Sequence, residues 1–220
     1  MIHTTSTSTL FIISAPSGVG KTSLVKKVIS KINNIGLSIS YTTRTKRSKE
    51  QDGIDYFFIN KENFLQMQHN KEFLESAEVF GNYYGTSNKF VFSLLNQGKD
   101  VMLEIDHQGA EQIKNQLEVS IKTNNLQAQI NCLSIFILPP SLQALTKRLT
   151  SRGQDDPIVI QQRLSAAKSE IQYYINYDYL VINDNFDKAV EDLVTIINAQ
   201  RLTIAKQQTV YASLINSLLV

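Results

Sequence analysis

Residues 14–23 of the chain read SAPSGVGKTS, a run that combines two glycines with a lysine and hydroxyl side chains. Its second half follows the pattern G-x-x-x-x-G-K-[ST], whose backbone N–H groups surround the phosphates of a nucleoside triphosphate. We expect Lys21 to contact the β- and γ-phosphates and the Thr22 hydroxyl to bind Mg²⁺. Ala15 replaces the first glycine, and its methyl group fits the loop as long as φ stays negative. The triphosphate-binding candidates are Ala15, Pro16, Ser17, Gly18, Val19, Gly20, Lys21 and Thr22.

The residues on either side of this loop support a phosphate site. Thr9–Ser14 is short, apolar and β-branched, which predicts a buried strand. Lys21–Asn33 has apolar residues three to four apart, which predicts a helix whose positive N-terminal end faces the loop. An ordinary glycine-rich turn is the alternative interpretation. The pattern does not identify the phosphate acceptor, because kinases, GTPases and other ATPases share it.

A second cluster of chemically capable residues lies in the segment TTRTKRSKEQDGIDYFFI, residues 42–59. Arg44 and Arg47 are three apart and Tyr56 follows, so two planar guanidinium groups and a phenol are available to bind a phosphate dianion. We expect Glu50 to hold one of the arginines in place. Taken alone, the segment is equally compatible with a solvated basic turn.

Three further arginines lie near the middle of the C-terminal half. Arg148 and Arg152 are four apart on a predicted helix and therefore share one face. Arg163 follows across a polar turn that contains Pro157. Without other information, an exposed amphipathic helix rich in arginine is the better interpretation of these three residues.

The remaining apolar patterns predict an α/β fold around a parallel sheet. Further strands are expected at 100–105, 132–138 and 179–183, and helices at 87–97, 108–117, 141–151 and 157–177. Residues 39–79 interrupt this alternation with two predicted strands, DYFFI and FLESAEVF, and a short helix at 62–69, which indicates an inserted lobe. Asp187 is the expected N-cap of the last long helix.

Two other segments have a less definite interpretation. The polar stretch 115–131 is expected to be a long surface loop or a partly helical excursion. The apolar end SLINSLLV is expected to pack against the core or against a neighbouring subunit.

Composition excludes several classes of protein. The net charge of the 220 residues is +2 and no block of Lys and Arg is present, which argues against a dedicated nucleic-acid or membrane binder. No apolar run approaches the ~20 residues that span a bilayer. The single cysteine, Cys132, cannot form an intramolecular disulfide, which fits a reducing compartment, and we expect a cytoplasmic protein.

Residues 42–59 match the guanylate kinase signature T-[ST]-R-x-x-[KR]-x-x-[DE]-x-x-G-x-x-Y-x-[FY], followed by an aliphatic residue, at every fixed position. APSGVGK, FLESAEVFGNYYGTS, LEIDHQGA, SIFILPPS, KRLTSRG, QRLSAA and YLVINDN also resemble this family, so the resemblance extends over residues 10–206. It implies a P-loop NTPase-type parallel sheet flanked by helices, with an inserted mixed α/β GMP-binding lobe and a helical lid. The single domain would comprise a core at 8–36, 98–138 and 178–210, the lobe at 37–97 and the lid at 139–177.

The resemblance also implies an acceptor site for GMP. Guanine presents N1–H and N2–H₂ donors together with O6 and N7 acceptors, a combination that adenine lacks. We expect Glu75 to accept from both donors, and Thr86 and Ser40 to donate to O6. The full set of implied GMP-binding residues is Ser40, Arg44, Arg47, Glu50, Tyr56, Glu75, Tyr84, Thr86 and Asp106.

For the donor side, the resemblance places Arg148, Arg152 and Arg163 over the phosphates when the lid closes. Together with Lys21 and Arg44, these three are the implied catalytic residues. Asn183, followed by Asp184, falls where the family contacts adenine. Glu104 stands where the family has aspartate, so a carboxylate near Mg²⁺, acting through water, is kept with a longer reach.

The implied activity is transfer of the γ-phosphate of ATP to GMP, and also to dGMP, with Mg²⁺. A non-catalytic guanylate-kinase-like module that binds phosphorylated peptides is the alternative, although such modules have degraded P-loops and this loop is intact. A relative that phosphorylates another small phosphate ester is a third hypothesis, which the complete guanine set disfavours. Expected partners are ATP and GMP, with no nucleic acid and no membrane, and a homo-oligomer is compatible with the apolar C-terminal end.

Overall fold

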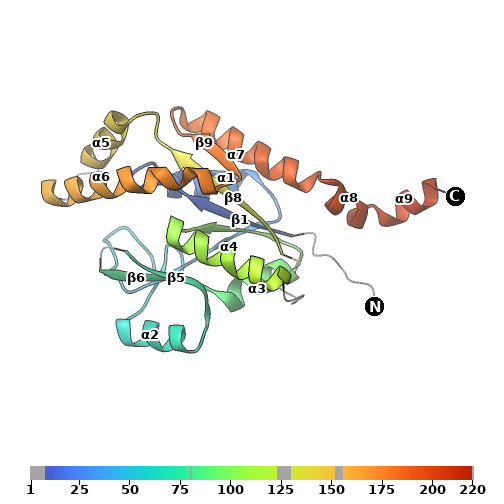
Figure 1. The fold of residues 1–220 in the computed structure, drawn as a ribbon, viewed down its shortest axis with the longest axis horizontal. Helices are drawn as coiled ribbons and strands as arrows, with labels where there is room; N and C mark the ends of the chain where they lie inside the picture. Colours follow the sequence, from blue (N-terminus) through green and yellow to red (C-terminus); the bar gives the residue numbers. More distant parts are fainter. Residues whose placement is uncertain (1–7, 80, 123–129, 152–155, 220) are drawn as a thin grey trace. The chain divides into compact units, whose positions relative to one another are not determined.

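The computed structural model describes residues 8–79, 81–122, 130–151 and 156–219 (Figure 1). The chain divides into two compact units. The loop unit contains Ala15–Asn33 and Ile135–Val220, and the strand unit contains Ser8–Ser14 and Asn34–Ser134. Each unit carries one group of the candidate residues.

The loop unit is built from helices around a parallel pair of strands. The C-terminal half of β8 (Asn131–Leu138) pairs with β9 (Tyr179–Ile182), from Ile135 opposite Tyr179 to Leu138 opposite Ile182. Its helices are α1 (Lys21–Lys31), α5 (Leu142–Ser151), α6 (Pro157–Ile171), the short 3₁₀ helix η2 (Gln172–Asn176), α7 (Phe186–Arg201), α8 (Ile204–Val210) and α9 (Ala212–Leu218). α7 packs against α1 because both present an apolar face, buried at Leu24, Val28 and Leu193.

The strand unit contains a parallel sheet in the order β2-β7-β1. β1 (Thr9–Ser14) and β2 (Ile35–Ser38) both pair in parallel with β7 (Asp100–Glu104). All six residues of β1 are buried, as the continuous apolar run predicts for a strand covered on both faces. Helices α3 (Asn88–Asn96) and α4 (His107–Lys122) pack on these strands.

A second, smaller sheet in the strand unit has the order β4-β3-β6-β5. It consists of β3 (Tyr41–Thr42), β4 (Phe57–Phe58), β5 (Phe73–Val79) and β6 (Asn82–Ser87). β6 pairs antiparallel with both β3 and β5. Helix α2 (Lys61–His69) packs on β5, and its fully buried Phe64 stacks on Phe73 with ring centroids 4.6 Å apart. This mixed sheet is the inserted lobe that the sequence indicates.

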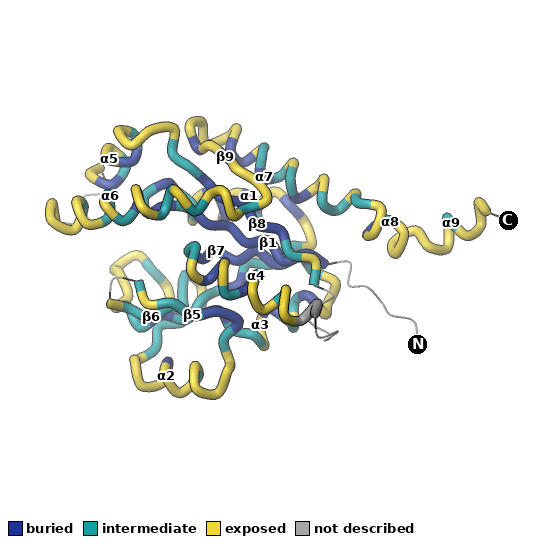
Figure 2. Tube along the Cα trace, in the orientation of Figure 1, coloured by how far each residue is buried: buried dark blue, intermediate teal, exposed yellow. Residues whose placement is uncertain are grey.

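The burial pattern follows the sheets and leaves one end of the chain exposed. Figure 2 shows buried backbone along β1, β7 and β8 and exposed backbone along α8 and α9. Within the ranges that the structure describes, no helix has both the length and the apolar character of a membrane span.

Most predicted elements are confirmed, and several segments differ from the prediction. The helix predicted at 157–177 is α6 followed by the 3₁₀ helix η2, because the tighter geometry begins at Gln172. Asp187 is not the N-cap of α7; Asn185 is, because its side chain accepts a hydrogen bond from the Lys188 N–H. The end of the chain is not packed on a core, since Leu218 in α9 is 74% exposed. The stretch 115–131 is helical as far as Lys122, and residues 123–129 lie outside the described residues.

Candidate active site

The glycine-rich loop, residues 15–20, follows β1 and leads directly into α1. Gly18 and Gly20 have φ of 91° and 100°, which is the left-handed region that glycine adopts without steric cost. Gly20 is the N-cap of α1, so the positive end of that helix lies at the loop. Ala15 is not among the described residues with positive φ, which is the condition under which its methyl group was expected to fit the loop.

Two polar side chains, the buried Asn183 and the half-buried Arg148, hold this loop in shape. The Asn183 Nδ2 donates to the Val19 carbonyl at 2.8 Å, and Arg148 Nη1 donates to the same carbonyl at 3.0 Å. Arg148 Nη2 also donates to the Asn183 carbonyl at 2.8 Å, which closes a small network. Asn183 is only 4% exposed, and its Oδ1 has no hydrogen-bond partner among the described residues. The sequence predicts neither contact, because the partners are far apart in the chain.

Helix α6 adds a third contact to the loop. Arg163 Nε donates to Ser17 Oγ at 3.0 Å, and the Ser17 N–H donates to Glu170 Oε2 at 3.2 Å. Glu170 is a site residue that no sequence pattern indicates, since a glutamate late in an amphipathic helix gives no local signal. Arg152, the remaining predicted arginine, lies outside the described residues.

Lys21 and Thr22 are the first two residues of α1. Lys21 is half-buried and Thr22 is exposed. Residues in the first helical turn lie beside the N–H groups that the helix leaves without intrahelical acceptors, so they meet whatever anion binds there. The structure therefore brings together the loop, Lys21, Thr22, Arg148, Arg163 and Asn183 in the loop unit.

In the strand unit, Glu50 gathers the two arginines of the second cluster. Its Oε1 lies 2.7 Å from Arg44 Nη2 and 3.8 Å from Arg47 Nη1. Its Oε2 accepts from the Arg47 N–H at 2.9 Å. The predicted role of Glu50 as a holder of arginine is thus confirmed, whereas a freely solvated basic turn is not what the structure shows.

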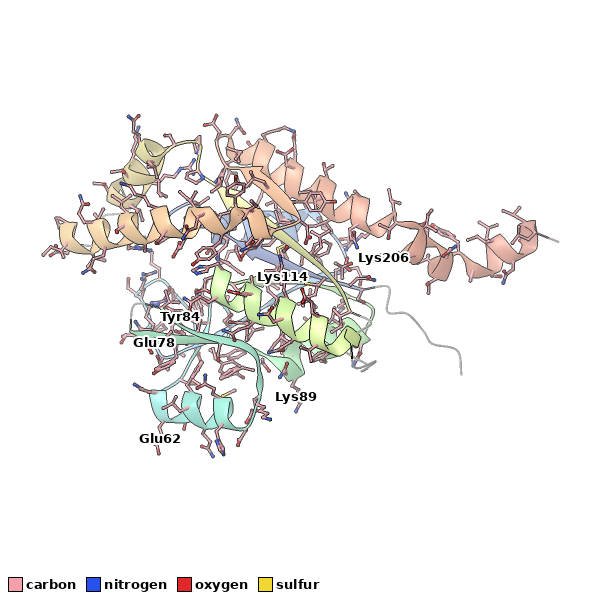
Figure 3. The ribbon with its side chains drawn as sticks, viewed as in Figure 1. Glu62, Glu78, Tyr84, Lys89, Lys114 and Lys206 are labelled. Carbon is pink, nitrogen blue, oxygen red and sulfur yellow. The ribbon has the colours of Figure 1, made fainter. Side chains whose placement is uncertain are left out.

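Aromatic rings complete this cluster. The Arg44 guanidinium carbon lies 5.5 Å from the centre of the Tyr56 ring and 5.8 Å from that of Phe58, within the range of cation–π attraction. Tyr84, labelled in Figure 3, lies on β6, and its ring centre is 6.0 Å from that of Tyr56. Arg44, Arg47, Glu50, Tyr56 and Tyr84 therefore form one group, which we call the arginine cluster.

The protonation states in the arginine cluster follow from these contacts. Burial is the largest single effect and opposes the charges of Arg44 and Glu50, but their mutual hydrogen bond and the surrounding charge interactions together outweigh it, so the pKa of Arg44 is raised and that of Glu50 is lowered. Burial, and then the charge of Glu104, raises the pKa of Tyr56 well above its ordinary value. The ion pair and the phenol proton are therefore both retained at neutral pH.

The four predicted guanine-binding residues belong to the strand unit: Glu75 and Thr86 lie on β5 and β6, and Ser40 and Asp106 lie just before β3 and α4. Glu75 on β5 is 5% exposed, and its Oε1 accepts a hydrogen bond of 2.5 Å from the Thr86 hydroxyl on β6. Thr86 was expected to donate to the guanine, but in this structure its proton is directed to Glu75. Asp106 accepts from the Gly109 N–H at 2.9 Å, and Ser40 is half-buried just before β3. The Glu75 carboxylate is therefore buried and hydrogen-bonded, although glutamate is usually exposed.

The structure also bears on metal binding. Glu104 is the half-buried last residue of β7 in the strand unit. The described residues contain no group of three or more His, Cys, Asp or Glu side chains that would hold a metal by itself. Mg²⁺ typically takes only one or two protein oxygens and completes its shell with phosphates and water. The hydroxyl of Thr22 and the carboxylate of Glu104 are oxygen donors of the required kind.

Comparison with known proteins agrees with this arrangement. A family model described as guanylate kinase matches residues 7–200. A guanylate kinase from Hahella chejuensis is 52% identical over 199 residues, which is 90% of this chain and 90% of that protein. A guanylate kinase from Saccharophagus degradans is 47% identical over 215 residues, which is 98% of this chain and 99% of that protein.

A solved structure gives the same result for the fold. The crystal structure of guanylate kinase from Anaplasma phagocytophilum superimposes with a TM-score of 0.71 at 30% sequence identity. The match covers 91% of this chain and 90% of that one. The resemblance found in the sequence motifs therefore extends to the three-dimensional structure.

Proposed function

The chain belongs to the guanylate kinase family, and we propose on that premise that it transfers the γ-phosphate of ATP to GMP, giving ADP and GDP. The observation that carries the proposal is the buried Glu75 carboxylate, which accepts a hydrogen bond from Thr86 on the neighbouring strand and has two oxygens that can accept from N–H donors. Guanine supplies two such donors on one edge. No observation favours the non-catalytic binding module.

Guanine recognition rests on the polar groups of the strand unit. Glu75 accepts from N1–H and N2–H₂, and Thr86, Ser40 and Asp106 complete the contacts with the base. AMP would leave these groups without partners, which lets a site discriminate by several orders of magnitude. This specificity also disfavours another small phosphate ester as the acceptor. dGMP is a further proposed substrate, since none of these contacts involves the ribose.

The arginine cluster holds the phosphate of GMP. Arg44 and Arg47 offer N–H groups to the phosphate oxygens, while Glu50 fixes the side chain of Arg44 before the substrate arrives. Tyr56 and Tyr84 each donate a phenol proton, which Tyr56 keeps because its pKa is raised. A phosphate oxygen of GMP is thereby oriented as the nucleophile.

The loop unit holds ATP. The N–H groups of the loop and the end of α1 bind the triphosphate, and Lys21 contacts the β- and γ-phosphates. Asn183 keeps the loop in its binding shape through Val19, and its buried Oδ1 is available to accept from the adenine amine. Asp184, exposed beside it, is a second adenine contact.

Transfer requires stabilisation of negative charge on the γ-phosphoryl group. The GMP oxygen bonds to the γ-phosphorus as the bond from that phosphorus to the β–γ bridging oxygen breaks, and ADP leaves with the bond's electrons. Arg148 and Arg163 supply positive charge beside the loop, with Arg152 as a third source. The lid, residues 139–177, is proposed to carry all three and to exclude water.

The remaining proposed divisions of the domain are the core at 8–36, 98–138 and 178–210 and the GMP-binding lobe at 37–97.

Mg²⁺ fits the donor set and is the proposed cofactor. Thr22 would bind it directly and Glu104 through water. When bound, the ion neutralises charge on the triphosphate oxygens.

We propose that the protein forms a homo-oligomer through its C-terminal helices. Leu202, Ile204 and Leu218 are 70%, 75% and 74% exposed. The single charged residue in the sequence from Leu202 to Leu219 is Lys206, which is 4% exposed and labelled in Figure 3. An interface between identical copies sets a surface against itself, so an uncharged surface avoids self-repulsion. Sedimentation velocity of Leu218→Ser against the parent tests this: a lower mass supports the oligomer, and an unchanged mass contradicts this interface.

Neither nucleic acid nor a membrane is a proposed partner. The cytoplasm is the proposed location, because the only cysteine cannot form an intramolecular disulfide and a reducing compartment is compatible with that.

The proposed activity is tested by ADP release from ATP and Mg²⁺ with GMP, dGMP, AMP, UMP and CMP. We expect release with the two guanine nucleotides. Equal rates across the panel would contradict guanine specificity, and no release with any acceptor would support the binding module. Lys21→Met is expected to abolish turnover, and Lys27→Met, an exposed lysine on the same helix, serves as the matched control.

A further inference from the structure

A glycine in the first turn of α4, Gly109, lies against the carboxylate of Glu75, which is proposed to bind guanine. Gly109 is a buried residue of this helix. A Cβ placed on Gly109 would lie 2.5 Å from Glu75 Oε2, 3.0 Å from its Cδ and 3.3 Å from its Cγ. The Glu75 side chain therefore lies along the space that any other residue at 109 would fill.

Glycine is not required here by the backbone. Gly109 lies in a helix and is not among the glycines with positive φ. Alanine is a better helix former than glycine at such a position. The reason for glycine at 109 is therefore the space that it leaves for the Glu75 carboxylate.

Gln112 on the same helix is hydrogen-bonded to the backbone of Ser76, the residue that follows Glu75. The Gln112 Oε1 accepts from the Ser76 N–H at 3.1 Å, and its Nε2 donates to the Ser76 carbonyl at 2.9 Å. This amide pairs with the residue after Glu75 as a neighbouring strand would. Gln112 is three residues after Gly109 and so on the same face of α4, which lies against β5 (Figure 1).

Gly109 also contacts the second guanine-binding carboxylate, because its N–H donates to Asp106 Oδ1 at 2.9 Å. One residue thus adjoins both acids, Glu75 through its missing side chain and Asp106 through its backbone.

We propose that Gly109 and Gln112 are positioning residues that determine guanine specificity by fixing the Glu75 carboxylate. The proposal rests on the proposed function, in which Glu75 accepts from the guanine donors. Glu75 cannot avoid a new methyl group by a small rotation, because the contact includes its Cγ and Cδ and because Thr86 holds its Oε1. Both positioning residues belong to the strand unit, whereas the ATP-binding loop belongs to the loop unit.

The first test is Gly109→Ala. The KM for GMP is expected to rise about 10- to 100-fold, the cost of weakening hydrogen bonds to a charged group. The KM for ATP is expected to stay within about twofold of the parent. IMP lacks the 2-amino group, so the preference for GMP over IMP should fall as well. Gln108→Ala, an exposed neighbour on the same turn, is the matched control and should change neither KM.

A rescue experiment separates positioning from a general loss of structure. Glu75→Asp shortens the acid by one methylene, which makes room for the alanine methyl. The double variant Glu75→Asp with Gly109→Ala should therefore lose less affinity for GMP than the sum of the two single losses. Additive losses, or an equal rise in both KM values for Gly109→Ala, would overturn the proposal.

Two further variants keep the test decisive. If Gly109→Ala does not fold, Gln112→Ala is expected to raise the KM for GMP selectively, and a change in neither KM would overturn the role of this turn. Glu75→Gln tests the underlying function: if it leaves the preference for GMP over AMP unchanged, guanine recognition by Glu75 is wrong. If Glu75→Gln removes that preference while Gly109→Ala has no effect, the positioning role alone is wrong.

Discussion

Gly18 illustrates how a single residue is constrained twice in the glycine-rich loop. Its φ of 91° is unfavourable for any residue with a side chain. A Cβ at this position would also lie 2.7 Å from Leu149 Cδ2 and 3.0 Å from Leu145 Cδ1, both on α5. The loop pattern in the sequence reflects the first constraint, whereas the second depends on a helix that lies far along the chain.

Gly18→Ala is expected to lower the free energy of unfolding by about 2 to 5 kcal/mol, the sum of backbone strain and overpacking. Gly81→Ala is the matched control, because Gly81 has φ of 74° but a Cβ there would meet nothing within 4 Å. Its loss should be about 1 to 2 kcal/mol, from strain alone. Chemical denaturation measures both. Equal losses in the free energy of unfolding for the two variants would show that overpacking against α5 does not contribute to the cost of Gly18→Ala.

The ion pair between Arg44 and Glu50 gives a prediction about pH. Because the folded protein lowers the pKa of Glu50, the pair adds stability that is complete above the unfolded pKa of about 4.3. That stability is lost as the pH falls through the still lower folded pKa. The parent should therefore exceed Glu50→Gln in free energy of unfolding at pH 7, and the difference should shrink between about pH 5 and pH 3.

Urea denaturation across this pH range checks the effect. Asp192→Asn removes the exposed Lys188–Asp192 pair and is expected to leave stability without measurable change at any of these pH values. A difference between the parent and Glu50→Gln that does not depend on pH would contradict the assigned pKa direction.

At the scale of elements, the start of α7 shows where local sequence rules are ambiguous. Asn185 and Asp187 are both suitable N-caps by residue type. The structure selects Asn185, whose Oδ1 accepts from the Lys188 N–H at 3.0 Å and leaves Asp187 in the first helical turn. Several residues near a helix start can act as N-cap. Which of them does so depends on how the helix is positioned by its buried residues, here Ala189 and Leu193.

Asn185→Ala is expected to destabilise the protein by about 1 kcal/mol, the usual value of an N-cap. For a chain of this size, that corresponds to a fall in Tm of about 2 to 4 °C. Asp187→Ala should cost less, because Asp187 lies in the first turn of α7, where its charge gains a smaller stabilisation from the helix dipole. If Asp187→Ala lowered the Tm more than Asn185→Ala did, Asp187 and not Asn185 would be the N-cap of α7.

What the sequence predicts well are features encoded within a few residues. β1 is confirmed at Thr9–Ser14, and α1 begins at Lys21, because an apolar run and a glycine-rich turn specify both locally. The sequence does not predict the bonds from Asn183 and Arg148 to the Val19 carbonyl, or the space at Gly109 that Glu75 occupies. Those contacts join residues more than thirty positions apart, and no local pattern specifies them.

At the scale of the whole molecule, the candidate residues for the two substrates belong to different compact units. The glycine-rich loop, Lys21, Arg148 and Asn183 are in the loop unit, and the arginine cluster with Glu75 is in the strand unit. The hydrogen bonds that fix each group also lie within its own unit. Each substrate should therefore be able to bind when the site for the other is disabled.

Thermal unfolding with each ligand tests this independence. A ligand at 100 times its Kd stabilises the folded state by about 2.7 kcal/mol, or a rise in Tm of about 5 to 10 °C here. Lys21→Met should lose the rise with ATP and keep that with GMP, because Lys21 is proposed to bind the triphosphate and not GMP. Glu75→Gln should show the opposite pattern, and Lys27→Met, the matched control, should keep both. If either Lys21→Met or Glu75→Gln removed both rises in Tm, the two groups would have to be one interdependent site, and the assignment of each substrate to its own unit would be wrong.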